Sequence, residues 1–437
     1  MASPPESIEP VADVIVEPGV NGAPAERSAP RGGPVGALAD RWGARWTVAT
    51  AWERFGLAIM AYVGTRVLLV IVALVDVALR HHSFTYEIAN WDGGWYRALA
   101  TDGYKHEVLR VSKWQTTTGF FPMYPMVVWL LSQPLLAFAS HPASASAEVQ
   151  AAIVAGFVIS LIGGLVATVL VQRVAGGWWG ERAGRRAAVL FCVFPGSVVF
   201  SMVYAEGIMI PLAIGCILCL QQRRWLLAGL LAAVATATEP EAAILIVVCA
   251  VSAGRELYRR GWRQREARRS LVAPLLAPAG LVGVVAFLWA WTGTPFAYTI
   301  AQHYGWDERF DPLALVHLGI RLAGQISFAH FNHPTINLNW PVGLIGAAIL
   351  VVLLVLMFRI RRTISLEAWI WTLGISFIGV TSEWVPPNPR ILITAFPAVI
   401  VPAYYLKRRG FGWLVVANVA LLIAMSAVTF VGVTLRP

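Results

Sequence analysis

The chain has 437 residues, of which 57% are hydrophobic and only 13% are charged, and its mean hydropathy is +0.65. Soluble domains carry about 25% charged residues, so this composition excludes an ordinary soluble enzyme. The net charge of +10 would suit a nucleic-acid partner, but most cations lie in short clusters between apolar segments, where membrane topology signals occur. We therefore expect an all-α polytopic membrane protein with no nucleic-acid partner.

The first 40 residues are rich in Pro, Ala, Gly and Glu and lack an apolar core. Such a composition cannot offset its own ordering entropy, so residues 1–40 are expected to be a disordered cytoplasmic tail and not a signal peptide. A transmembrane domain is expected over residues 41–437, because apolar segments able to cross a core of about 30 Å recur there. We place about eleven transmembrane helices near residues 55–79, 150–172, 187–203, 204–220, 225–238, 240–254, 270–292, 339–358, 364–382, 391–406 and 411–434.

Residues 119–138 are apolar enough to form a twelfth span, but the distribution of positive charge argues against it. If this segment does not cross, 19 of the 34 cations fall in 40 residues of connections on one side, which should be cytoplasmic. Three prolines within it also favour a broken helix at the interface. The prediction is then a first extracytoplasmic loop of residues 80–149 that carries interfacial helices, and a second of residues 293–338.

Asp92 lies in the first outer loop between Trp91 and two glycines, close to the end of the first span. Partial desolvation by aromatic neighbours makes a carboxylate more basic, and glycines let a substrate approach, so Asp92 is a candidate general base. Its alternative role is to cap a short helix over residues 93–101, since Asp is common just before a helix. The residues alone leave both interpretations open.

Charged groups also lie at the predicted outer ends of the later spans. Four of them are the carboxylates Glu206, Glu239, Glu241 and Glu383. Ionisable groups at membrane depth mark functional sites by default, although a solvated interfacial carboxylate explains any single one equally well. Arg390 is the one cation of its loop, and it either binds a phosphate in bidentate fashion or anchors a helix end among headgroups.

Aromatic and histidine residues of the outer loops suggest two further hypotheses. Four tryptophans either stack on sugar rings or belong to the interfacial aromatic belt: Trp91, Trp95, Trp114 and Trp306. His330 and His333 suggest metal ligands, but no cysteine or acidic residue is close to them in sequence. We therefore expect no metal there.

Several blocks resemble one known family. Trp91-Asp92, the segment Ala100 to Tyr104, Glu107 and residues 119–125 are similar to the tryptophan-aspartate, A-x-x-G-Y and A-F-F-P-x-Y-P pattern of the PIG-V mannosyltransferases, the GPI mannosyltransferase II family and its bacterial relatives. Residues 194–207 and 388–397 resemble later blocks of that family. The resemblance extends over about residues 55–410.

The sequence departs from the family pattern at two places. The family stretch Y-S-E-S is Tyr-Ala-Glu-Gly here, at residues 204–207, and Glu239 stands where a T-R-P turn has its arginine. The second change replaces a cation by a carboxylate. Any donor-phosphate role at this position is therefore in doubt, and more weight falls on Arg390.

The resemblance implies a GT-C glycosyltransferase that transfers mannose, with inversion, from polyprenyl-phosphate mannose to a lipid-linked or secreted acceptor on the extracytoplasmic face of the plasma membrane. It implies that Asp92 is the catalytic base, that Arg390 stabilises the departing phosphate and that Glu206 positions hydroxyls. No cofactor or divalent metal is expected. Further substrate-binding residues implied by the resemblance are Trp91, Tyr104, Glu107 and Tyr124.

Three alternatives stay open on sequence alone. The first is a GT-C transferase that uses another polyprenyl-phosphate sugar, such as arabinose or glucose. The second is a membrane transporter or lipid flippase, which would usually show inverted repeats and helices broken at mid-membrane; the sequence has no internal repeat. The third is a non-catalytic subunit of a glycan assembly complex, which the intact Asp92 argues against.

Overall fold

The computed structural model describes residues 48–108, 110–138, 141, 144–326 and 337–430. Within these ranges the regular structure is helical, and the single β-bridge is an isolated antiparallel pair between Phe310 and Ser382. The predicted all-α fold class is confirmed. The expected disordered tail, residues 1–40, lies outside the described residues.

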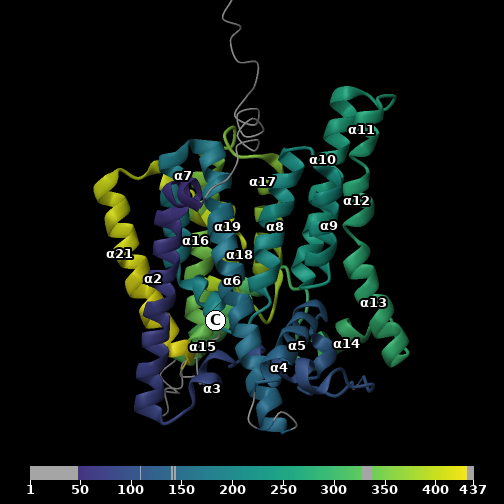
Figure 1. Ribbon diagram of the computed structural model, residues 1–437, viewed down its shortest axis with the longest axis vertical. Coiled ribbons are helices and arrows are strands. Elements are labelled where there is room, and N and C mark those ends of the chain that lie inside the picture. Colours follow the sequence, from purple (N-terminus) through teal and green to yellow (C-terminus); the bar gives the residue numbers. More distant parts are fainter. Residues whose placement is uncertain (1–47, 109, 139–140, 142–143, 327–336, 431–437) are drawn as a thin grey trace, which may run out of the picture.

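Most of the longer helices run along the long axis of the molecule (Figure 1). Over the residues that the structure describes, which exclude 431–434, the eleven predicted spans fall on helical segments. The bounds are α2 (Val48–Arg80), α6 (Ala145–Trp179), α7 (Glu181–Val193), η3 (Pro195–Ser201), α8 (Glu206–Gln221), α9 (Trp225–Thr236), η4 (Pro240–Ala243), α10 (Ile244–Arg260), α11 (Arg265–Arg269), α12 (Val272–Leu276), α13 (Ala279–Thr292), α16 (Asn339–Arg359), α17 (Leu366–Thr381), α18 (Pro389–Thr394), α19 (Phe396–Val399), α20 (Pro402–Tyr405) and α21 (Arg408–Phe430).

Helix length decides which of these segments can cross a membrane alone. A helix of about 20 residues spans about 30 Å. Among the described residues, five segments are long and apolar enough: α2, α6, α16, α21 and the run Arg265–Thr292 that joins α11 to α13. A sixth is formed if α7 and η3, which are bent by 73° at their junction, count as one broken span. The chain is a multi-pass membrane protein, and the total of eleven spans stays a prediction.

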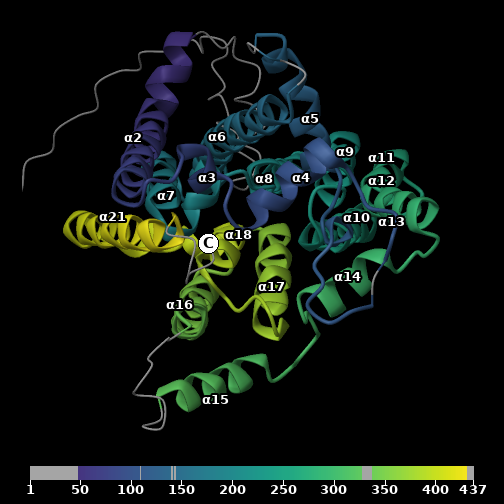
Figure 2. The same ribbon diagram turned by 90° about the horizontal axis from the view of Figure 1, so that it is seen from below.

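The two predicted outer loops form short helices that gather at one end of the molecule (Figures 1 and 2). The helix α5, which lies in the predicted non-spanning segment, contains Pro134. Its 14 residues make it shorter than a membrane-crossing helix. Figure 2 shows α15 set apart from the other helices of this end. Their bounds are α3 (Phe84–Ile88), α4 (Asp92–Asp102), η2 (Thr117–Gly119), α5 (Met123–Leu136), α14 (Ala297–Gly305) and α15 (Ala314–Ile326).

The arginine-rich connections lie together near the other end. The indole of Trp179 donates a hydrogen bond to the Thr363 hydroxyl at 2.9 Å, and Arg186 donates one to the Leu406 carbonyl at 2.7 Å. These contacts join three connections that are far apart in sequence. The charge pattern thus predicted correctly which connections share an end, although the two sides of the membrane are assigned by the pattern alone.

Two close backbone contacts bring the site-bearing segments together. A Cβ atom built on Gly196 would lie 1.9 Å from the Pro389 carbonyl oxygen, so only glycine lets α18 approach η3 this closely. A Cβ on Gly163 of α6 would lie 1.6 Å from the Gly207 carbonyl oxygen in the first turn of α8. These contacts hold the start of α18 against η3 and the start of α8 against α6.

Candidate active site

A cavity of about 450 Å³ opens at the end of the molecule where the outer-loop helices gather. Its wall combines aromatic rings from α4, the segment after η2 and the region of α14 with charged groups from α4, the α9–η4 turn, the segment after α14 and α18. Arg390 is the only cation among the described residues that line it. Four carboxylates line the same wall: Asp92, Glu239, Glu241 and Glu308.

Arg390 is bound by two carboxylates that are far apart in sequence. Its Nη1 donates to Asp92 Oδ2, and its Nε donates to Glu206 Oε1. The side chain of Glu206 is only 4% exposed, whereas those of Arg390 and Asp92 are 18% and 28% exposed. The guanidinium also lies over the Tyr204 ring, 5.0 Å from its centroid. Glu206 therefore holds Arg390 from the buried side, and the contact between Arg390 and Asp92 faces the cavity.

The local backbone presents Asp92 as the first residue of α4. The cap position belongs to Trp91, which forms no side-chain cap and has φ of 58°, a value that non-glycine residues seldom adopt. The Trp91 indole is held by the Thr429 carbonyl at 3.3 Å. The Asp92 backbone N–H donates to the Tyr204 hydroxyl at 3.3 Å. The structure therefore does not place Asp92 at the cap position, and its carboxylate faces Arg390 instead.

Arg390 is held by the first turn of α18. Pro389 occupies the start of this helix, where its missing N–H costs no hydrogen bond. The Asn388 side chain caps the helix by accepting from the Ile391 N–H at 3.0 Å. A cap of this kind fixes the direction of the first side chains. Arg390 thereby points past the contact between α18 and η3 and towards Glu206.

A second acidic group lies at the turn between α9 and η4. Glu239 is 7% exposed, and its Oε1 accepts a hydrogen bond from the hydroxyl of Tyr96, a side chain that is 1% exposed. At this position, where the family pattern has arginine, the carboxylate is thus satisfied by a phenol. Glu241 also lines the cavity, and its buried Oε2 has no hydrogen-bond partner among the described residues.

Glu308 joins the cavity from the second outer loop. Its Oε2 accepts from the Ser382 hydroxyl at 2.7 Å and from the Trp384 backbone N–H at 3.3 Å. Burial raises the pKa of Glu308 above its ordinary value, and the two hydrogen bonds partly oppose that rise. Burial therefore makes the Glu308 carboxyl easier to protonate than an exposed carboxyl.

Aromatic rings form one side of the cavity. Trp95 stacks on Phe120 with centroids 5.9 Å apart, and it meets Trp306 edge to face at 5.7 Å. Gly119 makes this packing possible, because a Cβ there would lie 2.6 Å from the Trp306 ring. Trp91 lines the cavity as well. The result is an apolar surface of the kind that contacts a sugar ring face or a lipid chain.

The structure brings together four of the residues predicted for the site, namely Trp91, Asp92, Glu206 and Arg390, and it places the other three elsewhere. Tyr124 is fully buried, and its hydroxyl bonds Gly156 and Ser160 of α6. The Tyr104 hydroxyl donates to the Phe120 carbonyl at 2.7 Å outside the cavity lining. Glu107 is exposed. Their roles in substrate binding stay predictions.

Where the structure describes them, the other residues that the sequence suggested for sugar or metal binding, or as charged groups at span ends, lie partly inside and partly outside the cavity lining. Trp114 is 54% exposed and does not line the cavity, unlike the other three outer-loop tryptophans. Glu383 pairs with Arg321 of α15 at 2.5 Å. His330 and His333 lie outside the described residues. Within the described ranges, no group of three or more His, Cys, Asp or Glu side chains is placed to hold a metal ion.

Sequence reasoning missed three residues of the site. Tyr96 and Tyr204 contact Glu239 and Arg390 through side chains that are fully buried, and nothing in the sequence marks a buried tyrosine as a partner of a charge. Glu308 had a usable signal, since it is an acidic residue two positions after Trp306 in a predicted outer loop.

The comparisons with known proteins concern both sequence and fold. The family model described as Mannosyltransferase (PIG-V) matches residues 65–300, which is more than half of the chain. This range is narrower than the predicted resemblance over residues 55–410. It contains Asp92 and Glu206 but not Arg390, which the structure nevertheless places against both. No curated protein matches the sequence.

Similar solved structures are ArnT from Cupriavidus metallidurans in the apo state (15% identity, 87% of this chain and 64% of that chain, TM-score 0.47) and ArnT from the same organism bound to undecaprenyl phosphate (15% identity, 84% and 69%, TM-score 0.48). Another is the Archaeoglobus fulgidus oligosaccharyltransferase in the apo form (14% identity, 83% and 56%, TM-score 0.44). The chain thus spans a little under two thirds of the first of these proteins.

Proposed function

Because the chain belongs to the PIG-V mannosyltransferase family, we propose that it transfers mannose from polyprenyl-phosphate mannose to a lipid-linked or secreted acceptor, with inversion at the anomeric carbon. The chain is a membrane glycosyltransferase; the donor, the acceptor and the stereochemistry are the proposal. The observation that carries it is the contact of one arginine with Asp92 and Glu206 at an aromatic-lined cavity.

The proposed step is a single displacement. The acceptor hydroxyl oxygen forms a bond to the anomeric carbon while the bond from that carbon to the phosphate oxygen breaks. Asp92 takes the hydroxyl proton, and the polyprenyl phosphate leaves with the electron pair. A β-linked donor gives an α-mannoside. Phosphate is a good leaving group, so this chemistry needs neither an acid catalyst nor a metal cofactor.

Arg390 is suited to the departing phosphate. A guanidinium has five N–H donors, and two of the nitrogens of Arg390 already bind carboxylates. In-line displacement requires the sugar to lie between base and phosphate, so Asp92 and the donor phosphate cannot both stay on one edge of Arg390. We infer that Arg390 keeps Glu206 and exchanges Asp92 for the phosphate, which frees the base.

The proposed active site faces the extracytoplasmic side. The support for this is the charge distribution, because the connections richest in arginine lie near the other end of the helices. The helices α3, α4, α5 and α14 would then lie at the outer surface, where a lipid-linked donor can reach the cavity sideways from the bilayer. The apolar surface around Trp95 and Trp306 would contact the sugar or the isoprenoid chain.

The proposal is tested by transfer of radiolabelled mannose from polyprenyl-phosphate mannose in membranes that contain wild type or Asp92→Asn, with native lipid extract as the acceptor. We expect labelled product from wild type and from the control variant, and none from Asp92→Asn. Glu148→Gln is the matched control, because it neutralises an exposed carboxylate of the same predicted loop that lies outside the cavity lining.

A panel of sugar donors completes this test. Turnover with polyprenyl-phosphate mannose, but not with the arabinose or glucose analogue, supports the mannose assignment. Turnover with another sugar alone would leave Asp92 in its role and replace the donor. Wild-type turnover that Asp92→Asn retains would remove Asp92 from the base role.

A further inference from the structure

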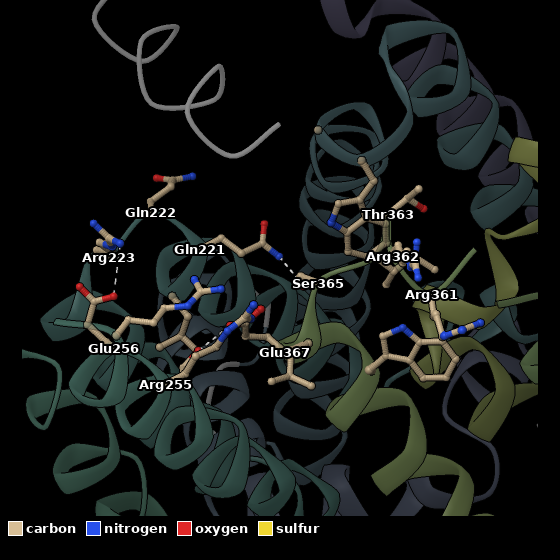
Figure 3. A pocket seen from close by; sticks show the side chains of 18 of the residues that line it. Gln221, Gln222, Arg223, Arg255, Glu256, Arg361, Arg362, Thr363, Ser365 and Glu367 are labelled. Atoms are coloured by element: carbon tan, nitrogen blue, oxygen red, sulfur yellow. Dashed lines mark hydrogen bonds and ion pairs between the residues drawn. The ribbon is translucent and has the colours of Figure 1, made fainter. Parts of the chain in front are cut away.

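A second and larger cavity lies near the end of the molecule opposite to Asp92. Its volume is about 1030 Å³, and it opens between the α8–α9 turn, the last turns of α10 and the α16–α17 turn (Figure 3). α8 has 16 residues and α10 has 17. At 1.5 Å per residue, each extends about 24 Å from the region of the proposed active site to this cavity. The two cavities are therefore separate sites.

The lining of this cavity has an excess of positive charge. Five arginines line it, against the two carboxylates Glu256 and Glu367: Arg223, Arg255, Arg259, Arg361 and Arg362. Figure 3 shows Arg361 and Arg362 on one side and Arg223 and Arg255 on the other. The cavity thus presents cations from two directions to whatever occupies it.

Among the residues that the structure describes, the two carboxylates leave three of the five arginines unpaired. Glu256 is paired with Arg223 at 3.3 Å and with Arg260 at 2.6 Å, and Glu367 accepts from the Ser252 hydroxyl at 2.7 Å. Within the part of the chain that the structure describes, Arg255, Arg259 and Arg362 form no ion pair or hydrogen bond. Three guanidinium groups are therefore available to an anion.

Two tryptophans complete the lining. Trp178 and Trp369 both line the cavity, and their rings offer an occupant an apolar contact surface. The α17 helix also begins at the cavity, and its N-terminus adds a partial positive charge.

A membrane topology signal explains on which side the arginines lie, but it does not explain why three arginines without a partner in the described ranges line one cavity. We propose that this cavity is a binding site for a phosphate-bearing anion, held by Arg255, Arg259 and Arg362. Arginine favours phosphate because its planar fork donates two parallel hydrogen bonds. An anionic lipid headgroup and a soluble phosphorylated compound share this chemistry. The inference is independent of the proposed mannosyl transfer.

The soluble source is tested by calorimetric titration of pyrophosphate into the purified full-length protein in maltoside detergent. Saturable binding is expected, weakened at least about tenfold in the triple variant Arg255→Gln, Arg259→Gln, Arg362→Gln. The matched control removes the same charge from the same end at three exposed arginines outside the cavity, as Arg263→Gln, Arg265→Gln, Arg268→Gln. This control should bind like wild type.

The lipid source is tested in nanodiscs of phosphatidylcholine with added phosphatidylglycerol. Native mass spectrometry then measures how much phosphatidylglycerol stays bound to each protein after detergent extraction. Selective loss in the cavity variant, relative to the control variant, supports the site and identifies a headgroup as its occupant. If the cavity variant loses binding only in the pyrophosphate titration, the result supports the site and identifies a soluble anion as its occupant.

Equal behaviour of wild type, cavity variant and control variant in both measurements would overturn the proposal. If the triple variant does not fold, the single variants Arg255→Gln and Arg362→Gln replace it, because each removes one exposed charge. We expect each to weaken binding about fivefold. Unchanged binding in both single variants would also contradict the site.

Discussion

The two cavities differ in how their charges are balanced. At the outer cavity, Arg390 is the single lining cation and is bound by Asp92 and Glu206. At the arginine cavity, lined by Arg255, Arg259 and Arg362 among others, cations outnumber carboxylates and three of them have no partner within the described residues. The first arrangement holds groups in place and can exchange one anion for another, whereas the second is suited to retain an anion.

This difference separates chemistry from binding. In the proposed mechanism, Asp92 becomes available as a base when Arg390 turns to another anion. An unpaired cluster of arginines contains no group that can accept a proton at neutral pH. Changes at the outer cavity should therefore affect turnover, and changes at the arginine cavity should affect binding of phosphate-bearing anions.

The largest effect is expected at Arg390. Arg390→Gln removes the charge that we propose stabilises the leaving phosphate, and it leaves Glu206 buried without its partner. We expect transfer to fall about 10²- to 10³-fold, measured as the rate of labelled product formation in membranes. Arg268→Gln, an exposed arginine of α11, is the control and should keep the wild-type rate. A loss below about threefold in Arg390→Gln would contradict the phosphate role.

A backbone change tests whether the outer cavity depends on the approach of α18. In Gly196→Ala, the new methyl group would overlap the Pro389 carbonyl, so the start of α18 must shift. We expect a loss of about 1–3 kcal/mol in the free energy of unfolding, together with lower transfer. The control is Gly176→Ala, since a Cβ there has open space, and alanine should stabilise α6 by about 0.5–1 kcal/mol. Equal thermal stability of the two variants would contradict this packing account.

A pair of tyrosines separates cavity contacts from structural ones. Tyr96→Phe removes the hydroxyl that binds Glu239 inside the outer cavity, whereas Tyr104→Phe removes one that binds a backbone carbonyl outside it. Each variant loses one hydrogen bond. We expect about a tenfold loss of transfer in Tyr96→Phe and little change in Tyr104→Phe. A larger loss of transfer in Tyr104→Phe than in Tyr96→Phe would contradict this expectation and would place a substrate contact at Tyr104 instead of at Glu239.

The smallest effect concerns pH. Because burial raises the pKa of Glu308, folding favours its protonated form. The resulting stability is fully present below the ordinary carboxyl pKa of about 4.5 and is lost as pH rises through the folded-state pKa. As pH rises from about 4 to about 7, the Tm of Glu308→Gln should therefore fall less than the Tm of wild type. Glu107→Gln, at an exposed carboxyl, should follow wild type; identical pH profiles for all three proteins would contradict the prediction.

The sequence predicted the all-α membrane fold, the shared end of the arginine-rich connections, and the charged residues Asp92, Glu206 and Arg390. These follow from hydropathy, charge placement and motif spacing. It did not reveal that Tyr124 packs inside the bundle, because a motif marks a residue without showing whether its side chain reaches the cavity. The contact between Asp92 and Arg390 joins residues 298 positions apart, and it depends on the backbone approach at Gly196.

A structure of the protein with polyprenyl phosphate bound would test the central claim most directly. The account predicts the phosphate within hydrogen-bond distance of the Arg390 guanidinium, with Asp92 released and Glu206 still in contact. Phosphate found only in the arginine cavity, with Arg390 still bridging Asp92 and Glu206, would contradict it.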